Sequence, residues 1–330
     1  VRYIRELDGL MQSSAAASQA LQPAPAGGVA AGGPAGLPVM PAGTAPTGTF
    51  LAYATAPGAV ALDGDKAGVA AAQRVIDCRG FTPSAALRGG WQVFLGRHLR
   101  TNQPHGLTRP VIMDARVAQH GAYRFVYVLP LTADELFIED TYYADSPRLD
   151  LALLNGRIDD YCDRHGWAGE VLGQETGVLP VVTGGDFAAW QASLRVPGVT
   201  RAGARAGFVH PLTSYTLPQA AAVADLIARH ADLPGEELAA LIETAAARHW
   251  AATGFYRQLG AMLFGAGAPD QRYRIFERFY RLPEPTIERF YAARSTLADK
   301  ARVLVGKPPV PVLGAMRALL ASGAPMAERA

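Results

Sequence analysis

The sequence has 330 residues, of which 49% are hydrophobic, and its formal net charge is +2. This length suits one large globular domain or two smaller ones, and the balanced charge excludes the basic footprint of a nucleic-acid-binding protein. Cys78 and Cys162 lie far apart without metal-ligand spacing, which excludes a disulfide framework or a zinc finger and favours a reducing, cytoplasmic setting.

The N-terminal 57 residues are dominated by Ala, Gly and Pro. Such a segment cannot bury enough side chain to offset the entropy of ordering it, so we expect residues 1–57 to be disordered. No charged segment in the chain leads into an apolar run of about 18 residues, so we expect neither a signal peptide nor a spanning helix. Any membrane contact should therefore be peripheral.

Several elements follow in chain order from local patterns. Val75 and Ile76, before a turn at Gly80, predict a short buried strand. Two runs rich in aromatic and β-branched residues, "YRFVYVLPL" and "ELFIEDTYY", are joined by "TAD" and predict an antiparallel hairpin. Apolar residues at helical spacing predict a helix that ends at Gly166, and a linker should then lead to "GVLPVVTGGDF". From residue 236 onward the pattern is helical and rich in Arg and aromatic residues.

Two neighbouring acids, Glu139 and Asp140, interrupt the second strand of the hairpin. Successive side chains of a strand point to opposite faces, so these carboxylates should not share a face. One interpretation places both at a sheet edge or end, where Thr141, a tyrosine or Arg124 would hydrogen-bond them. The other makes one of them a buried general acid with a raised pKa.

A second feature is the Gly-rich segment "GARAGFVHPLTSYT", residues 203–216, which leads into a helix with Thr216 as the expected N-cap. Gly203 and Gly207 would let the backbone approach a ligand, and the helix start offers free N–H groups. His210 and Thr213 add polar groups beside Pro211. A His before Pro is also common as a satisfied turn residue, so both interpretations stay open.

Two further stretches carry possible ligand groups. His98 and His105 have no carboxylate or Cys at ligand spacing, so we expect no metal site. Residues 272–309 contain nine Lys or Arg and four acids. They predict either core helices with a solvated basic side or a helix that lies on a membrane containing anionic lipid.

Many ordered segments together resemble one family, the bacterial lycopene β-cyclases, over residues 75 to 316. The matching segments are "VIDCRGF", "GGWQVFLGRHLRT", "PHGLTRPVIMDARV", "YRFVYVLPL", "LFIEDTYYAD", "GVLPVV", "AGFVHPLTSYTLP", "FYRQLGAMLF", "RFYRLPEPTIERFYAAR" and "GKPPVP". "FIEDT" at 137–141 resembles the "FLEET" element of the plant cyclases, and residues 206–215 resemble their flavin-side segment "AGMVHPSTGY".

The resemblance implies a mixed α/β fold like that of the FAD-dependent monooxygenases, with a Rossmann-related flavin-binding domain. It implies a flavin-binding domain over 58–84 and 196–235, a β-sheet substrate domain over 85–195 and a helical region over 236–330. Because residues 1–74 lack the GxGxxG fingerprint, we expect the N-terminal Rossmann unit to be incomplete.

The implied activity is the acid-initiated, non-redox cyclisation of lycopene to β-carotene, with reduced FAD and with NADPH as its reductant. Lycopene or another linear carotenoid would be the substrate, drawn from a membrane surface by a cytoplasmic, peripherally bound enzyme. The resemblance makes Glu139 the proton donor, with support from Asp140. It implies further sites, as follows: cofactor binding by Gly203, Gly207, His210, Pro211 and Thr213; and a substrate channel lined by Trp91, Tyr127, Phe137 and Tyr143. Alternatives are a non-catalytic carotenoid- or lipid-binding remnant and a flavin monooxygenase.

Overall fold

A computed structural model describes residues 51–56, 59–63, 68–71, 75–305, 312–321 and 323–327. Its strands are β1 (Leu51–Ala56), β2 (Ala59–Asp63), β3 (Gly68–Ala71), β4 (Val75–Asp77), β5 (Ser84–Thr101), β6 (Val111–Asp114), β7 (Tyr123–Pro130), β8 (Glu135–Ala144), β9 (Gly169–Gly185), β10 (Val199–Arg201) and β11 (Pro325–Met326). Its α-helices are α2 (Leu151–His165), α3 (Phe187–Ser193), α4 (Leu217–Arg229), α5 (Gly235–Ala252), α6 (Gly254–Ala266), α7 (Tyr273–Phe279), α8 (Glu284–Tyr291), α9 (Leu297–Leu304) and α10 (Val312–Leu320). Short 3-10 turns cover Gly203–Ala206 and Pro269–Gln271. The expected α/β class is confirmed.

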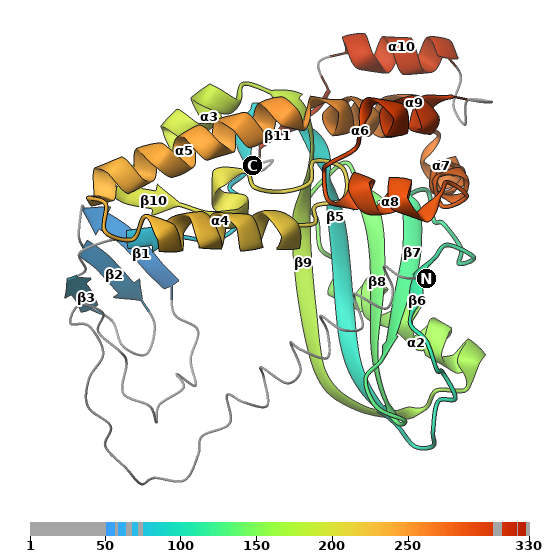
Figure 1. Cartoon of the computed structure of the whole chain (residues 1–330). Helices are drawn as coiled ribbons and strands as arrows, with labels where there is room; N and C mark the ends of the chain where they lie inside the picture. Colours follow the sequence, from blue (N-terminus) through green and yellow to red (C-terminus); the bar gives the residue numbers. More distant parts are fainter. Residues whose placement is uncertain are drawn as a thin grey trace, which may run out of the picture.

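A six-stranded sheet built around β5 dominates the molecule (Figure 1). β9 pairs with one edge of β5 along almost its whole length, and β8, β7 and β6 follow in antiparallel order from the other edge. Strand β11, from the far end of the chain, pairs with the start of β5. The sheet thus includes the last strand of the described chain, and β5 is its central element.

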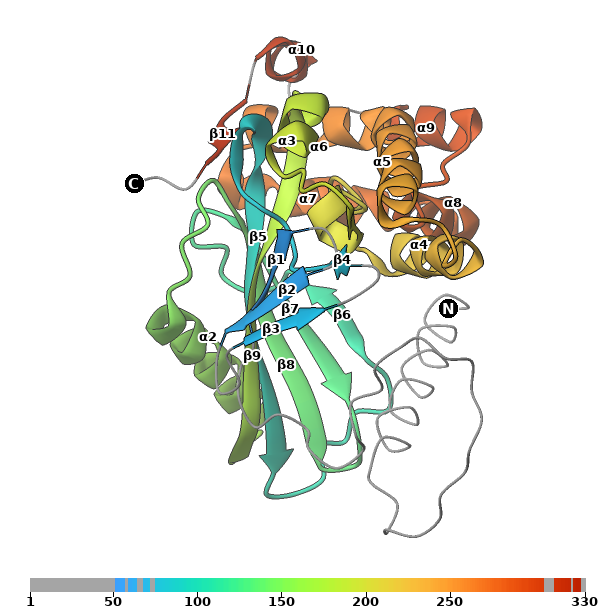
Figure 2. The same cartoon turned by 90° about the vertical axis from the view of Figure 1, so that its left-hand side faces the viewer.

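The predicted hairpin is confirmed as β7 and β8, which pair in register from Tyr123 opposite Tyr143 to Pro130 opposite Leu136. The predicted helix is α2, which begins after the N-cap Asp150 and ends at Gly166 in the left-handed conformation. α2 covers one face of the sheet (Figure 2). The core on this face contains the following residues of the sheet and α2: Leu95, Leu99, Val126, Val128, Leu136, Ile138, Leu154, Ile158 and Tyr161.

The helices from α6 to α8 pack against the opposite face at one end of the sheet. Aromatic residues dominate this second core: Tyr123, Phe125, Tyr143, Tyr256, Phe276 and Phe290. The Tyr123 and Phe276 rings stack with their centroids 4.3 Å apart. Aromatic contacts between the strands and the helices therefore hold the helical layer on the sheet.

Strands β4 and β10 form a separate parallel pair. The predicted strand at Val75 is confirmed as β4, but only Val75 of its two apolar residues is buried, since Ile76 is 44% exposed. Its pairing with β10 brings residues 75–77 beside 199–201. This contact joins the two segments that the sequence assigns to a flavin-binding domain. The tract expected to be disordered lies outside the described residues, except for 51–56, which form strand β1 in an antiparallel sheet with β2 and β3.

The expected linker before "GVLPVV" is wrong, because residues 169–185 form the continuous strand β9. Its first half is largely exposed at the edge of the sheet, and glycines and charged residues occupy it. An edge strand exposed in this way needs no alternating apolar residues, so the usual strand signal is absent. Pairing with β5 therefore forms this strand without a strong local pattern.

Candidate functional site

Strand β8 places Glu139 and Asp140 on opposite faces of the sheet, as predicted from strand alternation. Glu139 lies between Gly96 of β5 and Tyr127 of β7 in the register. Directly opposed residues of antiparallel strands point to the same face, so these two neighbours flank the Glu139 side chain. Asp140 points to the face that α2 covers.

The Glu139 carboxyl lies in a largely apolar and aromatic setting. The Thr141 hydroxyl donates a hydrogen bond of 2.7 Å to Glu139 Oε1. Burial raises the pKa of Glu139 to about 7, and the charges of Glu175 and Asp140 act in the same direction, whereas the Thr141 hydrogen bond opposes them. No cation in the described part of the chain is among the groups that shift this pKa. Glu139 can therefore hold its proton near neutral pH.

Asp140 is fully buried and is engaged by Arg124. Arg124 Nε lies 3.0 Å from Asp140 Oδ1 and 2.9 Å from Oδ2, and Nη2 also donates to Oδ2. Arg124 Nη1 donates to the Ala118 carbonyl oxygen at 3.0 Å. Burial raises the pKa of Asp140, and the arginine opposes that rise. The sequence-based alternative of an arginine partner thus describes Asp140, whereas Glu139 has only the Thr141 hydroxyl of the groups considered.

Two phenylalanine rings occupy the space beside glycines near Glu139. A Cβ on Gly96 would come within 2.2 Å of the Phe137 ring, and one on Gly177 within 2.2 Å of the Phe94 ring. Neither glycine has a positive φ, so ring packing rather than backbone conformation requires their lack of a side chain. The result is an aromatic surface on the Glu139 face, formed by residues of β5 and β8.

Tyrosines complete the surroundings of the acid. The Tyr127 hydroxyl lies 3.0 Å from the Tyr215 hydroxyl, and the Tyr215 ring stacks on Tyr291 at a centroid distance of 5.1 Å. Burial raises the pKa of Tyr127 and Tyr291 well above the ordinary tyrosine value. The phenols therefore stay neutral and present polarisable rings. Sequence reasoning identified Tyr127 but not Tyr215 or Tyr291, since their approach depends on tertiary packing.

The predicted channel residues divide between the faces. Tyr127, Phe137 and Tyr143 share the face of Glu139, and the buried Tyr143 hydroxyl donates to the Leu212 carbonyl oxygen at 3.0 Å. Trp91 lies opposite Ala144 in the register, on the side of Asp140. It packs in the other core, with the Phe81 ring centroid 6.0 Å away. The structure therefore does not bring Trp91 to the acid.

The His210 side chain is fully buried and fully used within the protein. Its Nε2 lies 3.0 Å from the Phe290 carbonyl oxygen, and the N–H groups of Leu212 and Thr213 donate to Nδ1 at 3.3 and 3.2 Å. Burial lowers the pKa of His210 to about 3. A neutral ring that donates through Nε2 satisfies all these contacts, which is the satisfied-turn interpretation.

The rest of the Gly-rich segment is partly open. Gly207 has φ 85°, and a Cβ there would come within 2.8 Å of the Phe187 ring, so internal packing accounts for this glycine. Gly203 has φ 57° and no atom within 4 Å of a built Cβ. Pro211 accepts a hydrogen bond of 2.9 Å from the Val182 N–H through its carbonyl oxygen. Thr213 Oγ1 is buried with no hydrogen-bond partner within the described residues.

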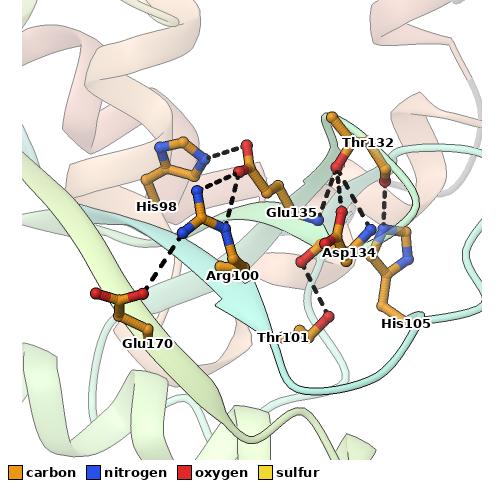
Figure 3. A network of polar contacts seen from close by, with 8 residues as sticks. All are labelled: His98, Arg100, Thr101, His105, Thr132, Asp134, Glu135 and Glu170. Atoms are coloured by element: carbon orange, nitrogen blue, oxygen red, sulfur yellow. Dashed lines mark hydrogen bonds and ion pairs between the residues drawn. The ribbon is translucent and has the colours of Figure 1, made fainter.

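His98, on β5, and His105, in the loop that follows β5, take part in separate contacts (Figure 3). His98 Nε2 lies 3.1 Å from Glu135 Oε2, and Arg100 also binds Glu135. His105 Nε2 lies 2.7 Å from the Thr132 carbonyl oxygen. Among the described residues, no three His, Cys, Asp or Glu side chains gather as metal ligands would.

The family model for "Lycopene cyclase protein" matches residues 51–317. Lycopene beta-cyclase of Pseudescherichia vulneris is 52% identical over 247 residues, which cover 74% of this chain and 64% of that protein. The enzyme of Pantoea ananas with the same name is 44% identical over 257 residues, covering 77% of this chain and 66% of that one. The chain thus spans about two thirds of the length of these relatives.

Among solved structures, a geranylgeranyl bacteriochlorophyll reductase-like protein from Thermoplasma acidophilum aligns with a TM-score of 0.41 and 12% identity, over 79% of this chain and 66% of that chain. The halogenase PltM aligns with a TM-score of 0.40 and 12% identity, over 82% and 70%. These likenesses are too slight to bear on the fold, whereas the family match and the identities are extensive. The chain belongs to the lycopene cyclase family.

Proposed function

We propose that this chain is a lycopene β-cyclase that converts the linear ends of lycopene, or of another linear carotenoid, into β-rings. The observation that carries the proposal is the Glu139 carboxyl on an aromatic face of the sheet, whose pKa of about 7 leaves a large share of it protonated at neutral pH. It occurs in the segment "FIEDT", in a chain 52% identical to a protein named lycopene beta-cyclase.

The reaction requires a proton donor and no net redox change. Glu139 gives its proton to the terminal double bond of the polyene, which leaves a tertiary carbocation. The neighbouring double bond attacks this cation and closes the ring, and loss of a proton from an adjacent carbon forms the ring double bond. Water would compete for the cation, so the acid must act in a largely dry setting, which the aromatic residues around Glu139 supply.

Aromatic rings near Glu139 supply electrostatic stabilisation of the cation. Tyr127 flanks the acid in the register, and the Phe137 ring packs against Gly96 on the same face. The face of an aromatic ring attracts a cation without offering a nucleophile. Asp140, held by Arg124 on the other face, acts as a positioning residue for strand β8 and not as a second donor.

FAD is the proposed cofactor, within a flavoprotein monooxygenase-like fold. Gly203 leaves room for close approach, and the unpartnered Thr213 Oγ1 can receive or donate a hydrogen bond. Both therefore fit a flavin, while Gly207, His210 and Pro211 hold the segment in place through internal contacts. When bound in its reduced state, after reduction by NADPH, the flavin supplies negative charge that stabilises a cation.

The polyene substrate is apolar, so we place the enzyme on the cytoplasmic surface of a membrane that stores it. In the described part of the chain, no helix has the length and apolar character needed to cross a bilayer. Peripheral attachment accords with this finding.

Expression in lycopene-accumulating bacteria tests the proposal through the appearance of β-carotene. Glu139→Gln should abolish the product, because the amide cannot give a proton, while the amount of folded protein stays the same. Glu135→Gln, in the same strand but bound to His98 and Arg100, is the matched control and should retain activity. Unchanged lycopene with the unaltered chain would contradict the function, and substrate-dependent oxygen consumption would favour a monooxygenase.

A further inference from the structure

An apolar cavity of about 260 Å³ lies within the C-terminal helices, apart from the Glu139 carboxyl. Helices α6 to α8 supply much of its wall, through residues such as Leu259, Met262, Leu263, Ile275, Phe279 and Phe290. Arg278 is the one charged residue that lines it in the described chain, and its guanidinium donates to the Val305 carbonyl oxygen. An empty apolar cavity excludes water and accepts hydrocarbon.

The outer wall of this cavity is also part of the protein surface. Leu304 of α9 and Met316 and Leu319 of α10 line the cavity, and each is about half exposed. Leu313 and Leu320 of α10 are 69% and 86% exposed. Helix α10 lies at the outer edge of the molecule, over α6 (Figures 1 and 2). The cavity is thus partly open to the surroundings along this apolar wall.

The same segment carries only positive charge. Residues 300–327 contain four basic residues, Lys300, Arg302, Lys307 and Arg317, and no acid. Arg302 and Arg317 are exposed on α9 and α10. An amphipathic helix with apolar side chains and flanking basic residues binds a bilayer that contains anionic lipid. The positive charge of this segment therefore favours an anionic bilayer as the partner of the apolar surface.

We propose that α10 and the end of α9 form a docking surface for an anionic phospholipid bilayer, and that the cavity behind them admits the end of one hydrocarbon chain from that bilayer. Pockets for whole small molecules measure about 300–1,000 Å³, so this cavity takes a chain end and not an entire long polyene. Exposed apolar side chains of α10 enter the acyl region, while Arg302 and Arg317 contact the headgroups.

Aromatic contacts connect this cavity to the acid. Tyr291 lines the cavity and stacks on Tyr215, whose hydroxyl contacts Tyr127 beside Glu139. The identification of the bound hydrocarbon chain as a carotenoid rests on the proposed function. Membrane docking and hydrocarbon binding do not rest on the proposed function, because neither requires cyclisation. Each can therefore be measured on protein that forms no β-carotene.

Vesicle flotation tests the docking surface. The purified chain should float with vesicles of phosphatidylcholine and phosphatidylglycerol and far less with phosphatidylcholine alone. The double variant Leu313→Asp, Leu320→Asp should lose flotation. Leu151→Asp, Leu153→Asp on α2 is the matched control, because these leucines are 49% and 48% exposed, and it should float as the unaltered chain does.

The charge is tested with Arg302→Gln, Arg317→Gln, which should weaken binding to the anionic vesicles about 30-fold. The control is the double variant Arg164→Gln, Arg229→Gln, which removes two exposed arginines outside α9 and α10. It should leave binding to the anionic vesicles unchanged. Flotation that survives both the aspartate and the glutamine variants, or that falls equally in the controls, would overturn the assignment of this surface.

The apolar fluorophore diphenylhexatriene tests the cavity without vesicles. Its emission should rise on mixing with the unaltered chain, and Ala315→Phe, which fills the cavity from α10, should reduce its affinity at least tenfold. Leu259→Trp fills the cavity from α6 and should reduce the affinity for diphenylhexatriene to a similar extent. With two such variants, a folding defect in one of them does not decide the result. Ala251→Phe on the exposed end of α5 should bind normally. Undiminished emission with both cavity-filling variants would show that the cavity does not bind the hydrocarbon.

Discussion

At the scale of single residues, two neighbouring acids acquire different properties from one strand. Glu139 faces aromatic rings and has a hydroxyl as its hydrogen-bond donor, so burial favours its neutral form. Asp140 faces the α2 side and has a guanidinium partner, which favours the ionised form. Alternation along a strand is thus enough to separate the proposed proton donor from a carboxylate that binds an arginine.

The raised pKa of Glu139 predicts how stability and activity change with pH. A carboxyl of pKa about 7 in the folded state, against an ordinary value of 4.5, keeps its proton while the unfolded chain loses it. Stability should therefore fall by about 3 kcal/mol between about pH 4.5 and 7 and then level off. Cyclisation should likewise decline above pH 7.

Urea unfolding of the unaltered chain and of Glu139→Gln, at pH 5 and at pH 8, measures this contribution. The glutamine variant cannot titrate at this position. Its free energy of unfolding, compared with that of the unaltered chain, should therefore be higher at pH 8 than at pH 5. An equal difference between the two proteins at both pH values would show that Glu139 is not buried as described.

At the scale of elements, the Arg124 and Asp140 pair joins β7 to β8 under α2. Both side chains are almost fully buried. Burying two charges is costly, and their attraction offsets that cost only while both are present. We therefore expect this ion pair to fix the alignment of the two strands more than to add stability, and through that alignment to hold Glu139 opposite Tyr127.

Arg124→Met should leave an unpaired buried carboxylate and destabilise the protein by about 3 to 5 kcal/mol. The double variant Arg124→Met, Asp140→Leu should recover most of that loss, as measured by urea unfolding. Arg229→Met breaks the exposed pair with Asp225 and should cost less than about 1 kcal/mol.

A positioning role for Asp140 makes a further distinction. Asp140→Asn should lower the amount of folded protein, while activity per folded molecule stays within a few-fold of the unaltered chain. A large loss of activity at unchanged stability would instead make Asp140 part of the proton-donating machinery.

At the scale of the whole molecule, the sequence predicts what local patterns determine. The alternation of "FIEDT" places Glu139 and Asp140 correctly, and the hairpin and α2 follow from their own residues. Trp91 could not be assigned to a face, because its register against Ala144 depends on the pairing of β5 with a distant strand. His210 is satisfied by Phe290, eighty positions away. The cavity wall likewise combines several helices.

Substitution of Met326 tests whether the core around this residue and the core under α2 unfold together. It is fully buried among Leu87, Trp91 and their neighbours, on strand β11, which pairs with β5. Met326→Ala should cost about 2 to 5 kcal/mol through the lost apolar contacts and the cavity left behind. Because β5 runs through this core and through the α2 core alike, unfolding should shift as one transition.

Trp167, packed in the α2 core, reports on that transition from a distance. In Met326→Ala, the urea midpoints of the Trp167 indole NMR signal, which separates it from the other three tryptophans, and of the far-UV circular dichroism should move to the same lower concentration. Leu217→Ala, at a side chain that is 57% exposed, should leave both unchanged. If Trp167 kept its original midpoint while the dichroism moved, the two cores would unfold separately, and β5 would not transmit the loss of Met326 along its length.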